Sequence, residues 1–408
     1  MTKKASTPAL RFKGFTYTWE QRKLSDQFSD FIVPMRDKPK KFGGNIPWTR
    51  IEDIEGKYLN GSLSGQFVSK DTIKQMNLKI IPKDSLIVSS SATFGVVAII
   101  TQDLITNQTF IGLVPNDKET LDFWYTFFHS NEARNYMRLQ SAGSTIFYIA
   151  REHFEKMPII IPFKDEMITI GKYFSNLDRL ITLHQRKYDK LTNMKKSMLE
   201  KMFPKNGANV PEIRFKGFTD AWEQRKLGEI ADIVGGGTPS TLNPDYWDGD
   251  IDWYAPAEIS DQIYVNSSQR KITEEGYENS SAKFLPPGTV LFTSRAGIGK
   301  TAILARKGCT NQGFQSIVPH KDKLDSYFIF SRTKELKSYG ELVGAGSTFV
   351  EVSSKQMASM ELMIPQSMAE QQKIGSYFRN LDRLITLHQR ELEKLKNLKK
   401  ACLEKMFV

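Results

Sequence analysis

The chain has 408 residues and a formal net charge of +11 at pH 7, with 40% hydrophobic and 25% charged residues. These proportions are typical of a soluble globular protein, and the basic excess indicates either a solubility surplus or a polyanionic partner. The only two cysteines, Cys309 and Cys402, stand in unrelated contexts, which excludes a disulfide framework. MTKKASTPAL lacks a signal-peptide core and no apolar run reaches membrane-spanning length, so we expect a cytoplasmic protein.

The sequence is a tandem duplication. RFKGFT occurs at residues 11–16 and again at 214–219, and both copies continue into WEQRKL, from Trp19 and from Trp222. NLDRLITLHQR occurs from Asn176 and returns 204 positions later, from Asn380, and each half ends in LEKMF. A period of this length fits a whole domain with its connecting element, not a solenoid repeat.

In chain order, an N-terminal segment (1–19) precedes a first domain (20–162), and a linker (204–222) precedes a second domain (223–365). Both domains contain short strand-like runs, such as DSLIVSSS, VVAII, TVLFTS and TAILA, broken by Gly, Pro, Asn and Ser. Aligned motifs, such as SSSATFG with TSRAGIG, return in the same order with little overall identity. We predict an α+β protein with two tandem mixed α/β domains that share a fold but differ in surface.

Residues 163–203 and 366–408 are each predicted to form one long helix. Apolar residues recur there at near-heptad spacing, and neither 172–203 nor 376–408 contains Pro or Gly. The length and even stripe favour a two-helix coiled coil over an ordinary core helix. The linker PKNGANVPEI spans at most about 35 Å, which is less than the roughly 50–60 Å of each helix. We therefore predict antiparallel helices, pseudo-two-fold symmetry and neighbouring chain termini.

Three patterns that could carry catalysis do not complete a site. GIGKT at Gly297 resembles the end of a phosphate-binding loop, but Ser294 replaces the required glycine and TAILA reads as a strand, so a glycine loop between strands is favoured. NPDY at Asn243 resembles the NPPY of DNA adenine methyltransferases, yet GGGTPSTLNPDYWDGDIDW is better interpreted as an extended aromatic-rich loop. The histidines make no ligand spacing, and we expect His184 and His388 to be buried packing residues. We therefore expect no catalytic residue, metal or cofactor in this chain.

Nucleic-acid contact is the better-supported chemistry, because Lys and Arg bind phosphate or guanine while Ser, Thr, Asn and Gln read base edges. The candidates in the first domain are Arg36, Lys38, Lys40, Lys41, Ser89, Ser90, Ser91, Thr93, Asn107, Gln108, Arg134 and Arg138. Those in the second domain are Thr238, Ser240, Tyr246, Arg295, Lys300, Asn311 and Gln312. The competing interpretation is that many are turn residues or solvated charges, with Asn107 and Asn311 holding a strand end in both copies.

Several phrases together give the sequence a family resemblance over its whole length. WEQRKLGEI, GGTPST, YWDGDIDW, TSRAGIG, NQGFQSI and YFRNLDRLITLHQ are similar to phrases of the DNA-specificity subunits of Type I restriction–modification systems. The first domain departs from this pattern, since it lacks GGTPS and has SSSATFG in place of TSRAGIG. That departure indicates a different recognition subclass for the first domain.

The resemblance implies a non-catalytic subunit that binds double-stranded DNA. Each domain would read half of a bipartite site, and the helices would set the gap. Two modification subunits with S-adenosylmethionine, which methylate adenine, and restriction subunits with ATP and Mg would dock on the helices. The polar helix residues identical in both copies are the candidates for docking: Asn176, Asp178, Arg179, Gln185, Arg186, Asn380, Asp382, Arg383, Gln389 and Arg390. A free-standing DNA-binding regulator is the alternative hypothesis, and solvated helix faces are the alternative for these residues.

Overall fold

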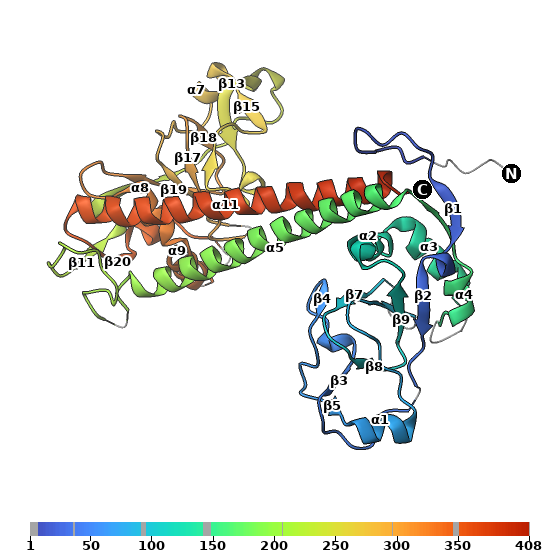
Figure 1. Ribbon diagram of the computed structural model, residues 1–408. Helices are drawn as coiled ribbons and strands as arrows, with labels where there is room; N and C mark the ends of the chain where they lie inside the picture. The colour runs from blue at the N-terminus through green and yellow to red at the C-terminus, as the bar shows by residue number, and fades with distance from the viewer. Residues whose placement is uncertain are drawn as a thin grey trace. The chain divides into compact units, whose positions relative to one another are not determined.

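The computed structural model describes residues 7–35, 37–90, 95–141, 148–205, 207–295, 297–345 and 351–407. The chain divides into two compact units, Met1–Gln185 with Arg390–Val408, and Arg186–Gln389. Each unit therefore combines one mixed domain with a part of both long helices. Figure 1 labels the elements of both units.

The first unit is built on one five-stranded, one three-stranded and one two-stranded sheet, in the orders β2-β9-β6-β7-β4, β5-β3-β8 and β1-β10. Its strands are β1 (Glu20–Lys23), β2 (Phe28–Ile32), β3 (Ile46–Thr49), β4 (Tyr58–Leu59), β5 (Phe67–Val68), β6 (Leu86–Ser89), β7 (Val97–Ile100), β8 (Ile105–Thr106), β9 (Phe110–Pro115) and β10 (Pro158–Ile161). Its shorter helices are α1 (Lys70–Met76), α2 (Leu121–Phe127), α3 (Asn131–Gln140) and α4 (Arg151–Glu155).

The second unit repeats this topology strand for strand, in the orders β12-β19-β16-β17-β14, β15-β13-β18 and β11-β20. Its strands are β11 (Glu223–Lys226), β12 (Ala231–Gly235), β13 (Trp247–Tyr254), β14 (Tyr264–Val265), β15 (Arg270–Ile272), β16 (Val290–Phe292), β17 (Thr301–Leu304), β18 (Cys309–Thr310), β19 (Gln315–Pro319) and β20 (Glu361–Ile364). Its shorter helices are α6 (Leu227–Ile230), α7 (Glu274–Glu278), α8 (Ser326–Ser331), α9 (Thr333–Gly344) and α10 (Ser354–Ala358). The prediction of two mixed domains with one fold is confirmed.

The buried runs of the sequence form the central strands, as expected. LIVS and VAII are fully buried in β6 and β7, and VLF and TAIL are fully buried in β16 and β17. Gly297 and Gly299 join β16 to β17 with φ of 101° and 92°, a conformation that favours glycine. GIGKT is therefore a loop between antiparallel strands, as interpreted, because Thr301 already belongs to β17.

One stretch of the second domain is more ordered than expected. The segment WDGDIDWY forms strand β13, which pairs with β15 on one side and with β18 on the other. The interpretation of the whole aromatic-rich stretch as a loop is therefore wrong for its second half. Trp247 and Trp253 explain the difference, since both rings are buried and pack edge to face at 5.1 Å. Aromatic side chains that pack on one face of a sheet favour a strand.

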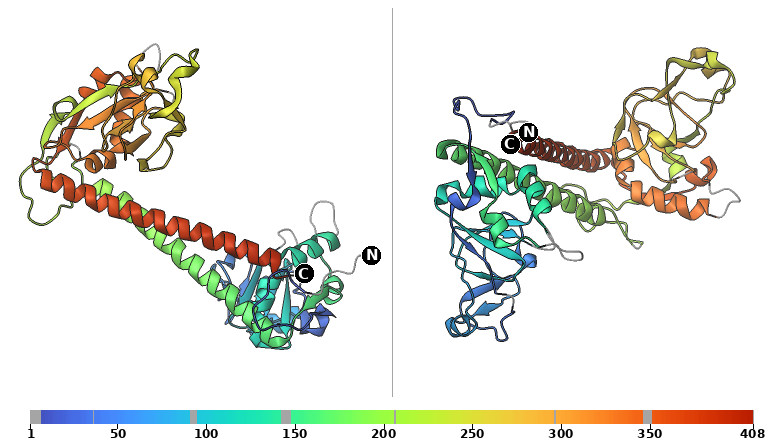
Figure 2. Two further views of the ribbon diagram at one scale, coloured as in Figure 1. Left: turned by 90° about the horizontal axis from the view of Figure 1, so that it is seen from above. Right: turned by 90° about the vertical axis from the view of Figure 1, so that its right-hand side faces the viewer.

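The two long helices are α5 (Lys164–Lys201) and α11 (Met368–Lys405), each 38 residues long, as predicted. In the first unit, Phe174 of α5 lies 6.3 Å from the Phe407 ring, and Asp178 bonds to Lys399. From Phe174 to Asp178 the residue numbers increase along α5, while those of their partners decrease from Phe407 to Lys399. The two segments are therefore antiparallel (Figure 2). In the second unit Phe378 stacks on Phe203 at 5.9 Å, and the same relation holds.

A glycine in each long helix lets a domain helix approach closely. A Cβ at Gly171 would lie 2.6 Å from the backbone nitrogen of Phe123, at the start of α2. A Cβ at Gly375 would lie 2.5 Å from the Asp325 carboxylate and 3.0 Å from the Phe328 nitrogen, at the start of α8. Only glycine fits at either position without displacing backbone or a helix cap, which ties the domains to the long helices in the same way twice.

The repeated RFKGFT…WE segments close each unit around a buried carboxylate. Arg11 donates two hydrogen bonds of 2.6 Å to Glu166 in the first turn of α5, and the Trp19 indole donates one of 3.3 Å. The Leu10 amide donates to the Lys405 carbonyl at 2.9 Å, which brings the first described residues beside the end of α11. The first and last described segments of the chain are therefore neighbours within the first unit, as the predicted arrangement requires.

The second unit repeats this closure. Arg214 donates bonds of 2.7 and 2.8 Å to Glu370, Trp222 donates one of 3.3 Å, and the Ile213 amide donates to the Lys201 carbonyl at 2.9 Å. The linker therefore connects α5 to the second domain through the same contacts by which the N-terminal segment connects α11 to the first domain.

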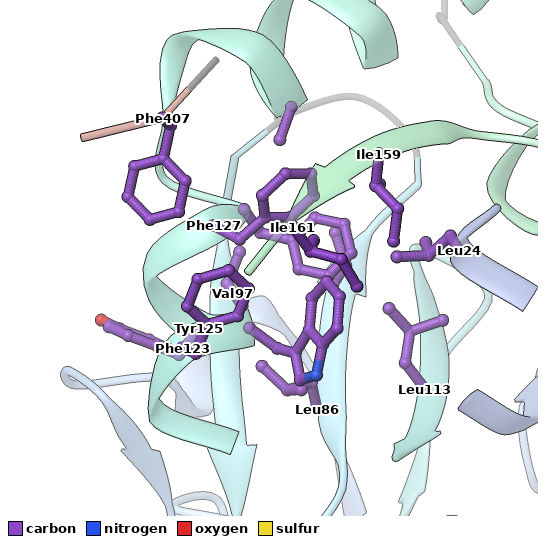
Figure 3. Packing of buried hydrophobic residues seen from close by; sticks show 14 of the residues in the cluster. Leu24, Leu86, Val97, Leu113, Phe123, Tyr125, Phe127, Ile159, Ile161 and Phe407 are labelled. Atoms are coloured by element: carbon purple, nitrogen blue, oxygen red, sulfur yellow. The ribbon is translucent and has the colours of Figure 1, made fainter. Parts of the chain in front are cut away.

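The LEKMF ends of the long helices complete the domain cores. Phe407 packs against Phe123 and Phe127 at centroid distances of 5.7 and 6.1 Å, as Figure 3 shows above helix α2. Phe203 packs in the same way against Trp222 and Phe328 in the second unit. Long helices and domains thus share one hydrophobic core per unit. None of the helices in the described part of the chain has the length and apolar content to cross a membrane.

Candidate nucleic-acid interface

Three loops of the second domain meet at one edge. The loop after β12 joins the loop after β18, since the Gly237 amide donates to the Thr310 carbonyl at 2.9 Å and the Thr238 hydroxyl bonds to the Gln312 side chain. The loop after β16 also contacts the loop after β18, because the Ser294 backbone amide donates to the Gly313 carbonyl at 2.8 Å. Four of the predicted contact residues, Thr238, Ser240, Arg295 and Gln312, are therefore brought together by the fold.

Two tryptophans of β13 fix the first of these loops. The Trp253 indole donates to the Gly237 carbonyl at 2.8 Å, and the Trp247 indole donates to the Ser240 carbonyl at 3.1 Å. The guanidinium of Arg270 lies 3.7 Å from the centroid of the Trp247 ring, a cation–π contact that further positions this ring. Ser240 stays exposed, and Tyr246 is half-buried at the end of the loop.

Arg295 and Lys300 lie in the β16–β17 loop, where Arg295 is half-buried and Lys300 is exposed. The Thr293 hydroxyl holds this loop closed, since it donates to the Gly297 carbonyl at 2.7 Å and accepts from the Lys300 amide at 3.0 Å. The neighbouring Ser294 hydroxyl is buried and has no hydrogen-bond partner among the described residues. The cations are thus presented on a braced turn, a geometry suited to an extended polyanion.

Asn107 and Asn311 occupy the same place in the two domains. The Asn107 carboxamide accepts from the Thr109 hydroxyl at 2.5 Å, and the Asn311 carboxamide accepts from the Gly313 amide at 2.8 Å. The backbone amides of these two asparagines donate to the carbonyls of Thr49 and Tyr254, at the ends of β3 and β13. Both carboxamides therefore shape the turn after a strand, which favours the competing interpretation for these two residues.

The prediction that Ser89 and Ser90 contact nucleic acid directly is wrong. Ser89 and Ser90 are 0% and 3% exposed, because β6 continues through Ser89 into the sheet and Ser90 bonds to the Thr109 carbonyl. Neither hydroxyl reaches a surface where a ligand could bind. Arg36, Ser91 and Thr93 lie outside the described residues.

The remaining candidates of the first domain are exposed. Lys38, Lys40 and Lys41 lie in the loop before β3, and the Lys38 ammonium lies 5.5 Å from the Phe42 ring centroid. Gln108 is exposed in the turn after β8, and Arg138 is exposed on α3. Arg134 is also exposed on α3, and a Cβ at Gly95 would lie 3.3 Å from its Nε, so this arginine lies beside the loop that precedes β7.

The long helices present the same polar face in each copy. Asn176 and Arg179 on α5 are exposed, as are Asn380 and Arg383 on α11. Arg186, Gln389 and Arg390 are also exposed, whereas Gln185 is half-buried. Two residues missed by the sequence analysis lie among them: Leu183 is 41% exposed, and its equivalent Leu387 is 51% exposed. A leucine that is identical in both copies but lies outside the apolar stripe was the available signal.

Two of the expected docking residues serve inside the units instead. Asp382 is 6% exposed, accepts a hydrogen bond of 2.8 Å from the Tyr327 hydroxyl and lies 2.5 Å from the Lys195 ammonium. Asp178 is half-buried and lies 2.5 Å from the Lys399 ammonium. Burial beside the carboxylate raises the pKa of Tyr327, which keeps its hydroxyl protonated as the donor. Both carboxylates are committed to these ion pairs, so we leave them out of the docking face.

Metal-ligating side chains do not cluster in the described part of the chain. No group of three His, Cys, Asp or Glu side chains there could hold a metal ion. Burial raises the pKa of the Cys309 thiol to about 12, so this cysteine is protonated at neutral pH. His184 and His388 are half-buried rather than buried, because each lies at the edge of its helix stripe.

Comparison with known proteins identifies relatives over the whole chain. The family model of the Type I restriction modification DNA specificity domain matches residues 17–193 and 219–397. The chain is 36% identical over 192 residues to the Type I restriction enzyme MjaIX specificity subunit of Methanocaldococcus jannaschii, a match that spans 46% of this chain and 44% of that protein. The putative type I restriction enzyme MjaX specificity subunit of the same organism is 24% identical over 398 residues, which are 94% of this chain and 91% of that protein.

A solved structure shares the fold. The crystal structure of the Type-I restriction-modification system S subunit from M. genitalium superimposes with a TM-score of 0.62 at 15% identity, and the match covers 98% of this chain and 99% of that one. The tandem arrangement of two mixed domains with long helices is therefore a known architecture.

Proposed function

Because the chain belongs to the family of Type I restriction–modification DNA specificity subunits, we propose that it selects a bipartite DNA sequence, with one half-site read by each domain. It acts without catalytic residues of its own, in the cytoplasm. Adenine methylation and DNA cleavage are carried out by modification and restriction subunits that bring S-adenosylmethionine, Mg and ATP.

This proposal rests on the contrast between the strand arrangement, which the two domains share, and the loop residues, which differ between them. Both domains have the same strand orders, yet the residues in equivalent loops differ. The loop between β2 and β3 exposes Lys38, Lys40 and Lys41, whereas the equivalent loop between β12 and β13 carries Thr238 and Ser240. Two identical folds with different polar edges fit the recognition of two different short sequences, because base edges are read by side-chain hydrogen bonds.

The repeated helix faces fit the docking of two copies of one modification subunit. Each face combines an exposed arginine and asparagine with an exposed leucine: Asn176, Arg179 and Leu183 on α5, and Asn380, Arg383 and Leu387 on α11. Interfaces are enriched in arginine and place apolar side chains at their centre. Leu183→Glu with Leu387→Glu should abolish co-purification of the modification subunit while the variant chain stays folded, and the single variants should each retain one copy. Retention of both copies by the double variant contradicts this assignment.

Methylome sequencing tests the proposed function directly. A host strain that expresses the modification subunit should show a bipartite adenine-methylated motif only when this chain is present. Exchange of residues 20–162 for those of another family member should alter one half of that motif and leave the other half unchanged. A motif that is independent of the chain overturns the proposal, and tight sequence-specific binding by the chain alone, without partners, favours a free-standing regulator.

A further inference from the structure

Leu242 is exposed to a degree that the folding of the second domain does not explain. Its side chain is 94% exposed, more than any other large hydrophobic side chain among the described residues. It lies in the loop between β12 and β13, whose neighbours Trp247 and Trp253 are buried. An apolar side chain held in water forgoes the stabilisation that burial would give it, so this exposure indicates a role in binding.

The loop presents Leu242 from a fixed position. On the N-terminal side, the carbonyls of Gly237 and Ser240 accept hydrogen bonds from the two buried tryptophans. On the C-terminal side, the Asn243 carboxamide accepts from the Asp245 amide at 3.1 Å, and the Thr273 hydroxyl donates to the Asp245 carbonyl at 2.8 Å. A tip braced on both sides loses little conformational entropy when a ligand binds to it.

The surroundings of Leu242 are polar, and they belong to the edge described above. Ser240 and Gln312 are exposed, and Thr238 is bonded to Gln312. In the major groove, hydroxyl and carboxamide groups match the hydrogen-bonding edges of bases, and the C5-methyl of thymine is the apolar group that they leave unread. A lone, fully exposed leucine beside such groups has the chemistry that complements this methyl.

We propose that Leu242 contacts the methyl group of one thymine in the half-site read by the second domain. This assignment rests on the proposed function and deepens it, because it predicts a preference for thymine at one position of that half-site. The contact involves no hydrogen bond, so its contribution depends only on the presence of the methyl group.

Replacement of thymine by uracil isolates this contact, because it removes the methyl group and leaves base pairing intact. The complex of this chain with its modification subunits is titrated with duplexes that carry uracil at each thymine of the second half-site in turn. Wild type should bind roughly fourfold more weakly at one position, the loss expected for one buried methyl group. Leu242→Ala should bind the thymine and uracil duplexes equally at that position. Leu342→Ala, which changes another leucine of this domain that is 76% exposed on α9, should keep the wild-type response.

The outcomes separate this inference from the proposed function. A complex that selects a motif but shows no position sensitive to uracil, or a second half-site without an A·T pair, overturns the role of Leu242 alone. Uniform weakening by Leu242→Ala on all duplexes also overturns it, since a side chain wedged between base steps would act in this way. Loss of complex assembly in Leu242→Ala overturns it in favour of a protein contact. A wild-type complex that selects no motif instead contradicts the proposed function.

Discussion

Asp178 on α5 lies 2.5 Å from Lys399 on α11, and the equivalent residues of the other copy, Asp382 on α11 and Lys195 on α5, make the same contact at 2.5 Å. The two ion pairs are related by the duplication, and each lies within its own unit. A one-residue slip of either helix would separate both pairs, so they specify the antiparallel register as well as stabilising it.

The two aspartates should differ in their energetic contribution despite their identical sequence context. Asp382→Asn should lower the free energy of unfolding by about 3 kcal/mol, because the carboxylate that it removes is only 8% exposed and is bound by both the Lys195 ammonium and the Tyr327 hydroxyl. Asp178→Asn should cost about 1 kcal/mol, since the Asp178 carboxylate is 23% exposed and therefore better solvated than that of Asp382. Urea unfolding of the two variants checks this order, and equal losses would contradict it.

The buried carboxylates at the starts of the long helices should be among the most sensitive positions. Glu166→Ala should destabilise the first unit by about 3–5 kcal/mol, because the Arg11 side chain, 13% exposed, loses the carboxylate that accepts two of its hydrogen bonds. Glu370→Ala should have the same effect on the second unit through Arg214. Limited proteolysis with mass spectrometry would locate the loosened unit. The exposed Glu20→Ala is the control and should change little.

Stability of the first unit should depend on pH through His129. Burial lowers the pKa of His129, and its Nδ1 lies 2.7 Å from the Tyr125 carbonyl oxygen, where a neutral ring donates. In the unfolded chain a histidine has a pKa of about 6.5. Below that value the unfolded chain binds the additional proton, so the free energy of unfolding falls as pH decreases towards the lowered pKa of the folded state.

His129→Gln should therefore reduce the loss of stability between about pH 7.5 and pH 5.5. Denaturant unfolding at both pH values measures this difference, and the same substitution at His153 serves as the control. An unchanged pH dependence in His129→Gln would assign the effect to other groups.

Arg295 should contribute to recognition by the second domain. Arg295→Ala should weaken DNA binding by about 1–3 kcal/mol and relax one position of the half-site if the guanidinium binds a guanine edge. A loss that is uniform across sequences, with a reduced salt dependence, would identify a phosphate contact. Binding titrations with a panel of single-base variants distinguish the two, and an unchanged affinity removes Arg295 from the interface.

Insertion in both helices should lengthen the unread gap of the target. Four residues added after Gln185 and four after Gln389 lie between the two ion pairs on each helix, so both pairs can still form. They extend each helix by about 6 Å, which corresponds to one or two base pairs. Methylome sequencing should show a wider gap with both half-sites unchanged. The same insertion in one helix alone should disrupt one ion pair and destabilise the chain, and unchanged spacing in the double insertion would refute the role of the helices as a ruler.

The sequence by itself determined the duplication, the two mixed domains, the two long helices and their antiparallel direction. Each of these follows from local information: repeated phrases, the period of apolar residues, and a linker too short to run back along a helix. The roles of individual polar residues depended on the tertiary structure, because burial and partners come from contacts distant in sequence. Ser89 and Ser90 are polar residues, but they lie at the end of a buried strand. Asp382 is a core residue only because Lys195 and Tyr327 both contact it. Leu242 reads as an ordinary apolar residue in the sequence, and only the folded chain leaves it in solvent beside polar groups.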